Sequence, residues 1–199
     1  MLIRAFAVLL ATTCGAYADN LPALFDVTGV ASDDTLNVRT RPMGGANIIG
    51  TLAYDAKGIE VIEEQSNWGR VNVDGGTGWA SMKFLKMQPQ SSLPEAQNLR
   101  CFGTEPFWSL NITQGETAVL STPEGSDRGF IVGSLQAASA RPEPYAIQGA
   151  GQGENITVVV SKEICSDGMS DNLFGLDGTV VIGGYLTEVL SGCCTVQVD

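Results

Sequence analysis

The chain has 199 residues, of which 22 are acidic and 11 are basic, so its net charge is −11, and it contains no histidine. The missing histidine excludes hydrolases that activate a serine or cysteine with a histidine base, and it excludes zinc sites with histidine ligands. The acidic balance argues against binding nucleic acid through its phosphates. The length allows one large domain or two small ones.

The first 18 residues have the pattern of a secretory signal peptide. Residues 1–4 carry a positive charge, residues 5–11 (AFAVLLA) are apolar, and residues 16–18 (AYA) place small side chains before a cleavage site at Asp19. The apolar run is far shorter than the roughly 20 residues that span a bilayer, and no later segment is longer. Lipidation at Cys14 is the minor alternative. We therefore expect a periplasmic or secreted protein.

Four cysteines follow the signal peptide, namely Cys101, Cys165, Cys193 and Cys194. An even number in an oxidising compartment predicts two disulfides, for which three connectivities exist. A bond between the neighbouring residues 193 and 194 needs an awkward backbone, and neighbours in a strand point to opposite faces, so we expect each to have a distant partner. The alternatives are a site with four thiolate ligands, which an oxidising compartment disfavours, and a redox pair that uses Cys193 or Cys194.

A polar segment at residues 88–99 (QPQSSLPEAQNL) is predicted to be a linker. The preceding residues 26–87 contain 8 acidic and 6 basic side chains, whereas residues 100–199 contain 12 and 4 and all four of these cysteines. This asymmetry predicts two separately folded domains.

Both domains are predicted to be all-β. Five short stretches of β-forming residues lie within about sixty residues of the first domain, and so many short strands close as a small barrel. The second domain is predicted to be an antiparallel barrel or sandwich stapled by the disulfides. Its glycine-rich segment 148–154 is interpreted as a break between strands. Because a strand and not a helix follows this segment, it is not a phosphate-binding loop.

The first domain resembles the bacterial SH3 (SH3b) domain over residues 26–87. The resemblance implies an SH3-like barrel that binds peptidoglycan or another peptide. The motifs that carry it are Leu36-Asn37-Val38-Arg39-Thr40-Arg41-Pro42, Ile49-Gly50-Thr51-Leu52, Gly58-Ile59-Glu60-Val61, Asn67-Trp68-Gly69-Arg70-Val71, Gly78-Trp79-Ala80 and Phe84-Leu85-Lys86.

Aromatic and basic side chains of this domain are the candidate ligand-binding residues. Trp68 lies next to a turn, where an indole can face a ligand, and Tyr54 is a second candidate on the rim. The guanidinium groups of Arg39 and Arg41 could hold a carboxylate of a ligand. The simpler interpretation is that both arginines are surface charges near two neighbouring acidic residues. Trp79 is assigned to the core because it opens a strand after a glycine.

The second domain resembles a domain of uncharacterised bacterial exported proteins and lipoproteins, with the pattern CxGxEPFWxLxI, CxDGMSD and GCC. The resemblance implies a compartment and no activity. Residues 105–108 (EPFW) are interpreted as an aromatic strand that enters the core. The carboxylates of Asp167 and Asp171 lack the spacing of a calcium-binding loop and are assigned to a turn.

The predicted function is non-catalytic binding of peptidoglycan or peptide in the cell envelope, without a cofactor or a metal. Glycosidases need a pair of carboxylates placed across a sugar, and no pattern in the sequence fixes such a pair. The alternative is that the acidic second domain inhibits or otherwise binds another exported, basic enzyme through charge complementarity. Neither nucleic acid nor a membrane span is part of the prediction.

Overall fold

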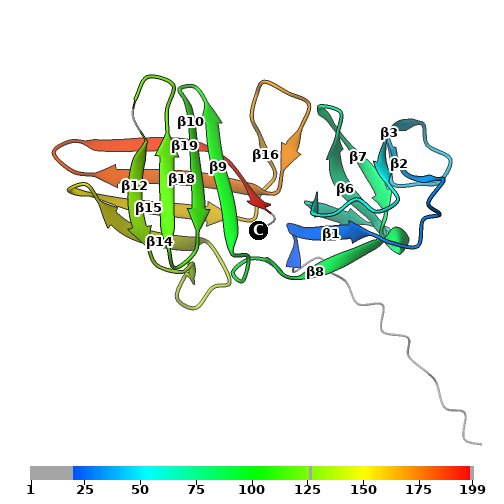
Figure 1. The fold of residues 1–199 in the computed structure, drawn as a ribbon, viewed down its shortest axis with the longest axis horizontal. Coiled ribbons are helices and arrows are strands. Elements are labelled where there is room, and N and C mark those ends of the chain that lie inside the picture. Colours follow the sequence, from blue (N-terminus) through cyan, green and yellow to red (C-terminus); the bar gives the residue numbers. More distant parts are fainter. Residues whose placement is uncertain (1–19, 126, 198–199) are drawn as a thin grey trace, which may run out of the picture.

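The computed structural model describes residues 20–125 and 127–197. Two β-structured units lie side by side along the long axis of the molecule, the larger on the left and the smaller on the right of Figure 1. No helix among the described residues is long and apolar enough to cross a membrane. The predicted signal peptide and Cys14 lie outside the described residues.

The small unit folds as a barrel from two antiparallel sheets. The first sheet has the order β4-β1-β8 and the second has the order β3-β2-β7-β6-β5. Alternate side chains of β1 (Ala23, Phe25 and Val27) point into the core, where Phe25 is fully buried. The strands are β1 (Ala23–Val27), β2 (Thr35–Arg39), β3 (Ile48–Ala53), β4 (Ile59–Val61), β5 (Glu63–Gln65), β6 (Trp68–Val73), β7 (Gly76–Ser81) and β8 (Leu85–Ser92), and a 3-10 turn, η2 (Met82–Phe84), precedes β8.

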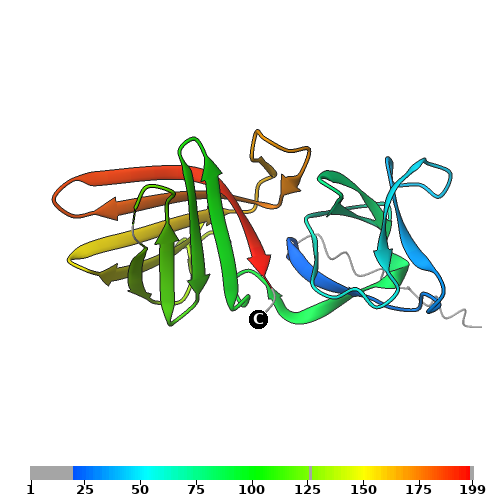
Figure 2. The same cartoon turned by 45° about the horizontal axis from the view of Figure 1, so that its top comes forward.

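The large unit is a closed eight-stranded barrel in which consecutive strands are antiparallel neighbours. Its order is β12-β11-β10-β9-β19-β18-β15-β14, and a further pairing between β12 and β14 closes the ring (Figure 2). Closure removes the exposed edges that an open sheet would leave. The ring strands are β9 (Asn98–Thr104), β10 (Phe107–Thr113), β11 (Thr117–Ser121), β12 (Arg128–Val132), β14 (Tyr145–Gly151), β15 (Glu154–Ser161), β18 (Leu176–Gly183) and β19 (Thr187–Gln197), and the short strands β13 (Gln136–Ala137), β16 (Cys165–Ser166) and β17 (Leu173–Phe174) flank them.

The prediction that residues 148–154 break the sheet is wrong, because most of this segment is strand. Residues 148–151 belong to β14, and the turn is confined to Gln152 and Gly153. A Cβ on Gly149 would lie 2.4 Å from the Ile131 carbonyl oxygen, and one on Gly151 would lie 2.1 Å from the Gly129 carbonyl oxygen. The glycines therefore serve the close approach of β14 to β12 that closes the barrel.

The disulfides join Cys101 to Cys194 and Cys165 to Cys193. The expectation that residues 193 and 194 have separate, distant partners is confirmed. Cys101 and Cys194 face each other across β9 and β19, where the two ends of the barrel sequence meet, and both are fully buried. The other disulfide ties the loop that carries β16 and β17 to the outside of β19.

The predicted linker at residues 88–99 is largely built into the fold. Strand β8 extends to Ser92 and pairs with β1, and β9 begins at Asn98. Between them, Leu93 and Ala96 are buried in the core of the large barrel. The buried amide of Gln114 holds this segment, because its Nε2 donates to the carbonyl oxygens of Pro94 and Ala96. These two apolar residues thus anchor the segment. The sequence analysis did not predict their burial, because the segment as a whole is polar.

Further contacts join the two barrels. Leu24 points away from the core of the small barrel and joins the core of the large one. In β17, the backbone of Leu173 pairs with the side chain of Asn72, whose Nδ2 donates to the Leu173 carbonyl (2.7 Å) and whose Oδ1 accepts from the Leu173 amide (3.2 Å). The loop that carries β16 and β17 lies between the barrels at the top of Figure 1.

Candidate functional site

A groove of about 360 Å³ opens on the small barrel beside β2, β6 and the end of β7. Two half-buried aromatic side chains, Trp68 and Phe84, form part of its wall, and polar side chains line the remainder. The polar lining residues are Asp34, Thr35, Asn37, Arg39 and Ser81. A shallow surface with aromatic walls and a few polar groups is the usual form of a peptide-binding or small-ligand site.

The position of Trp68 follows from the tight hairpin between β5 and β6. Ser66 and Asn67 both adopt positive φ, which turns the chain sharply and places Trp68 first in β6, opposite Ser81 of β7. Trp68 is half-buried there and lines the groove.

Phe84 is held on the other side of the groove by backbone contacts. It ends the short turn η2, and its carbonyl accepts a hydrogen bond from the Thr28 amide at 2.8 Å. Gly29 lies directly against the Phe84 ring, since a Cβ there would be 3.8 Å from Cδ1. Lys83 is exposed, and its ammonium lies 5.3 Å from the centre of the Phe84 ring.

The charged groups of the groove have opposite signs. Arg39 is half-buried, and one of its terminal nitrogens donates to the Ala46 carbonyl at 2.7 Å, which fixes the guanidinium. Asp34 is exposed and accepts from the Thr35 amide at 2.7 Å. A guanidinium and a carboxylate that line one groove can recognise an acidic and a basic group on one ligand.

Residues 34–86, which include all the groove residues named above except Gly29, match the bacterial SH3 domain family. The small barrel is a bacterial SH3 domain. The match begins after β1, so the structure adds the strand that completes the barrel and that also contacts the second domain. A search of curated proteins found no match, and a search of solved structures found none. The resemblance of the second domain to exported proteins and lipoproteins stays a prediction.

The structure brings two of the four predicted ligand-binding residues of the SH3 domain into the groove. Trp68 and Arg39 line it, whereas Tyr54 and Arg41 are exposed in loops and do not. Trp79 is 7% exposed, and the guanidinium of Arg70 lies 5.2 Å from the centre of its ring, as expected for a core residue that also packs under a surface charge.

Sequence reasoning did not predict the other groove residues of the SH3 domain, among them Asp34, Asn37 and Phe84. Phe84 stands where the family pattern has an aromatic residue, and its place in that motif was the signal that pointed to it. Asp34 and Asn37 carry no such signal, because polar residues before and within an exposed strand are common.

A groove of about 460 Å³ lies at the candidate motifs of the second domain. Its lining residues are 102–105, 165–169, Asp177 and 191–193. Trp108 is 4% exposed and lies under Gly103, so the EPFW segment does enter the core, although Phe107 points to solvent. Asp167 closes its own turn, because its Oδ1 accepts from the amides of Met169 and Ser170. These bonds hold the pKa of Asp167 below its ordinary value.

An ion network lies inside the barrel of the second domain, near the hairpin between β18 and β19. Arg128 of β12 contacts Glu154 of β15 at 3.4 Å and Glu188 of β19 at 2.5 Å. Each of the three residues stands two positions before a buried residue of its strand. Because alternate side chains of a strand share a face, all three side chains face the inside of the barrel. The charged groups at this end of the barrel are thus paired with one another. We therefore do not assign a binding site to them.

Proposed function

We propose that this chain is a non-catalytic binding protein of the bacterial cell envelope, and that the groove of its SH3 domain binds a peptide segment of peptidoglycan. The observation that carries the proposal is the groove itself, in which Trp68 and Phe84 form part of the wall and Arg39 and Asp34 offer opposite charges. The opposite charges suit a peptide that bears both carboxylate and ammonium groups. Two disulfides favour an oxidising compartment outside the cytoplasm.

Co-sedimentation of the chain without its first 18 residues with purified peptidoglycan sacculi tests this function. We expect binding by the native protein, and we expect Trp68→Ala to weaken it about 5- to 100-fold, the effect of losing one stacked aromatic contact. The matched control is Phe107→Ala, because Phe107 is also an exposed aromatic residue but lies on the second domain. Its binding should equal that of the native protein.

Two results would contradict the proposal. The first is sedimentation that Trp68→Ala leaves unchanged while its circular dichroism remains native. The second is the absence of sacculus binding together with capture of a soluble basic enzyme, which would support the inhibitor alternative through the acidic second domain. Dye release from labelled sacculi checks the non-catalytic part, and enzymatic release that a point variant abolishes would refute it.

A further inference from the structure

A second and larger cavity, of about 700 Å³, lies between the two domains. One wall comes from residues 21–22 and from residues 62–64 of the SH3 domain, and the other comes from the start of β14 and the end of β15 in the large barrel. Clefts between domains are a common place for ligands, and this volume is within the range of small-ligand pockets. The SH3 groove, by contrast, lies on residues that do not line this cleft.

The floor of the cleft is apolar. Leu21, Pro22 and Ile62 are buried residues that line it, and Ile164 contributes an exposed side chain at the rim. An aliphatic group that enters the cleft would therefore leave water for an apolar surface, which is favourable in proportion to the area covered.

The rim of the cleft is negatively charged. Four carboxylates, those of Glu63, Glu64, Glu143 and Glu163, line it together with one ammonium group, that of Lys162. Of the four, Glu63 is paired with Arg70 at 3.0 Å and Glu143 accepts the Lys162 backbone amide at 2.9 Å. One carboxylate oxygen of Glu64 is buried without a hydrogen-bond partner among the described residues.

The side chain of Tyr145 adds an aromatic wall and a hydroxyl to the cleft. Tyr145 is 5% exposed and lines the cleft, and the ammonium of Lys162 lies 5.9 Å from the centre of its ring. A phenol hydroxyl can both donate and accept a hydrogen bond, so it can bond to a polar group that enters. Burial raises the pKa of Tyr145, and the nearby carboxylates of Glu143 and Glu95 raise it further.

We propose that the cleft between the domains binds a ligand with an aliphatic stem and a primary ammonium group, such as a lysine side chain of a peptide. The stem would lie on the apolar floor, and the ammonium group would be held by Glu64 and Glu163 with the Tyr145 hydroxyl as a further acceptor. A metal ion suits the site less well, because no three carboxylates or cysteines among the described residues are grouped to hold one. The proposal is independent of the SH3 groove.

Binding of 1,5-diaminopentane to the whole chain without its first 18 residues tests the proposal. Amide chemical shifts in a ¹H–¹⁵N spectrum should change around residues 62–64, 143–145 and 162–164. The matched probe 1,5-pentanediol, which has the same stem and no charge, should bind at least about tenfold more weakly, because it makes no charge-assisted bond.

Variants of the cleft separate the contributions of charge and hydroxyl. We expect Glu64→Gln combined with Glu163→Gln to weaken binding of the diamine about tenfold, and Tyr145→Phe to weaken it about threefold, as losses of charged and neutral hydrogen bonds predict. Glu124→Gln removes an exposed glutamate outside the cleft and should leave binding unchanged. Circular dichroism and melting temperature establish that each variant is folded.

The proposal is overturned if the diol binds as tightly as the diamine, if the shifts map to another surface, or if the folded double glutamate variant binds the diamine with native affinity. If Trp68→Ala loses binding to sacculi but binds the diamine with native affinity, the groove and the cleft are separate sites. That result would support the proposal.

Discussion

Glu60 illustrates how a single residue of the SH3 domain is placed by the domain packed against it. Its carboxylate oxygen Oε1 accepts the backbone amide of Val196 on β19 at 2.9 Å. Burial at this junction raises the pKa of Glu60 to about 7, and the hydrogen bonds from Thr195 and Val196 oppose the shift without cancelling it. The group is thus harder to ionise in the folded chain than in the unfolded one.

This shift predicts how stability depends on pH. Because the folded pKa lies above the ordinary value of 4.5, the stabilising effect is complete below pH 4.5 and is lost as the pH rises to about 7. The loss amounts to about 3 kcal/mol at most. We expect Glu60→Gln, which keeps the oxygen that accepts the Val196 amide, to match the native protein at pH 4 and to exceed its free energy of unfolding at pH 8.

Urea denaturation at both pH values measures the effect of Glu60→Gln. The control is Glu116→Gln at an exposed turn, which should change stability little at either pH. Equal stability of Glu60→Gln and the native protein at pH 8 would show that Glu60 is ionised without cost in the folded chain.

At the scale of elements, closure of the large barrel depends on the contact between β12 and β14. Only two residue pairs form this ladder, Ile131 with Ala150 and Val132 with Gly149. Next to them, the backbone of Gly129 lies so close to Gly151 that a side chain on Gly151 would collide with a carbonyl oxygen. A fixed backbone atom cannot move aside as a flexible side chain can.

The collision predicts that Gly151→Ala lowers the free energy of unfolding by about 1–3 kcal/mol, the usual cost of overpacking. Gly129→Ala is the matched control, because it lies in the facing strand and a Cβ there would meet nothing within 4 Å. It should change stability by less than about 0.5 kcal/mol. Equal melting curves for the two variants would show that the strands separate at this seam without cost.

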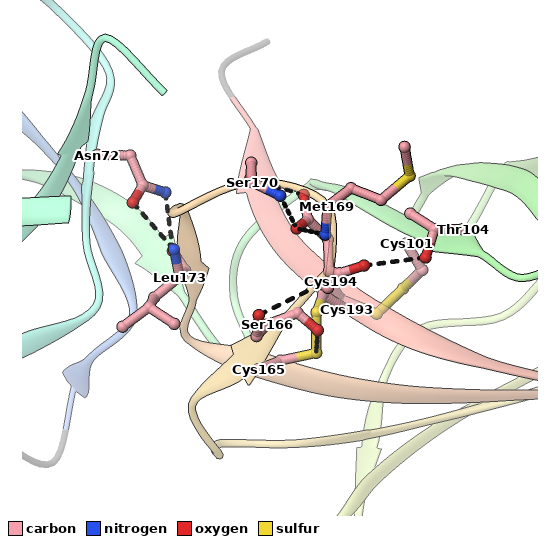
Figure 3. The surroundings of a disulfide bond; sticks show 12 residues. Asn72, Cys101, Thr104, Cys165, Ser166, Met169, Ser170, Leu173, Cys193 and Cys194 are labelled. Carbon is pink, nitrogen blue, oxygen red and sulfur yellow. Dashed lines mark hydrogen bonds between the residues drawn. A yellow bond between two sulfur atoms is a disulfide. The ribbon is translucent and has the colours of Figure 1, made fainter. Parts of the chain in front are cut away.

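At the scale of the whole molecule, the Cys165–Cys193 disulfide has a role beyond the large barrel. It fixes the loop that carries β16 and β17, and β17 carries the Leu173 backbone to which the side chain of Asn72 of the SH3 domain is hydrogen-bonded (Figure 3). The ring of Phe174 also packs edge-on against Phe102 at 4.8 Å, which presses the loop onto β9. The Cys101–Cys194 disulfide lies within the barrel wall and does not touch this loop.

We expect the double variant Cys165→Ser with Cys193→Ser to loosen the contact between the domains while the large barrel stays folded. Chymotrypsin should cleave first at Leu173 or Phe174, and small-angle scattering should show a larger radius of gyration, because the loop is no longer tethered. The control, Cys101→Ser with Cys194→Ser, should instead lower the stability of the barrel by about 2–5 kcal/mol without early cleavage in the loop. Identical digestion of both variants would contradict this division of roles.

The sequence by itself determined the all-β class, the SH3 domain and the separate partners of residues 193 and 194. It also predicted enough strands for two domains. These follow from local signals, namely alternation, turn residues and a motif with fixed spacing. The same signals placed Trp68 next to a turn and Arg39 on a strand, and both line the groove of the SH3 domain; their role in binding stays a prediction.

Only the tertiary structure decided which positions meet across the chain. Glycines 149 and 151 serve as strand residues because of β12, about twenty residues away, and Leu93 and Ala96 are buried because Gln114 holds their segment. Tyr54 and Arg41 lie outside the groove, and the cleft between the domains combines residues 21–22 and 62–64 with residues 142–145 and 162–164. Contacts over such distances depend on the closure of both barrels, and no local pattern of residues records them.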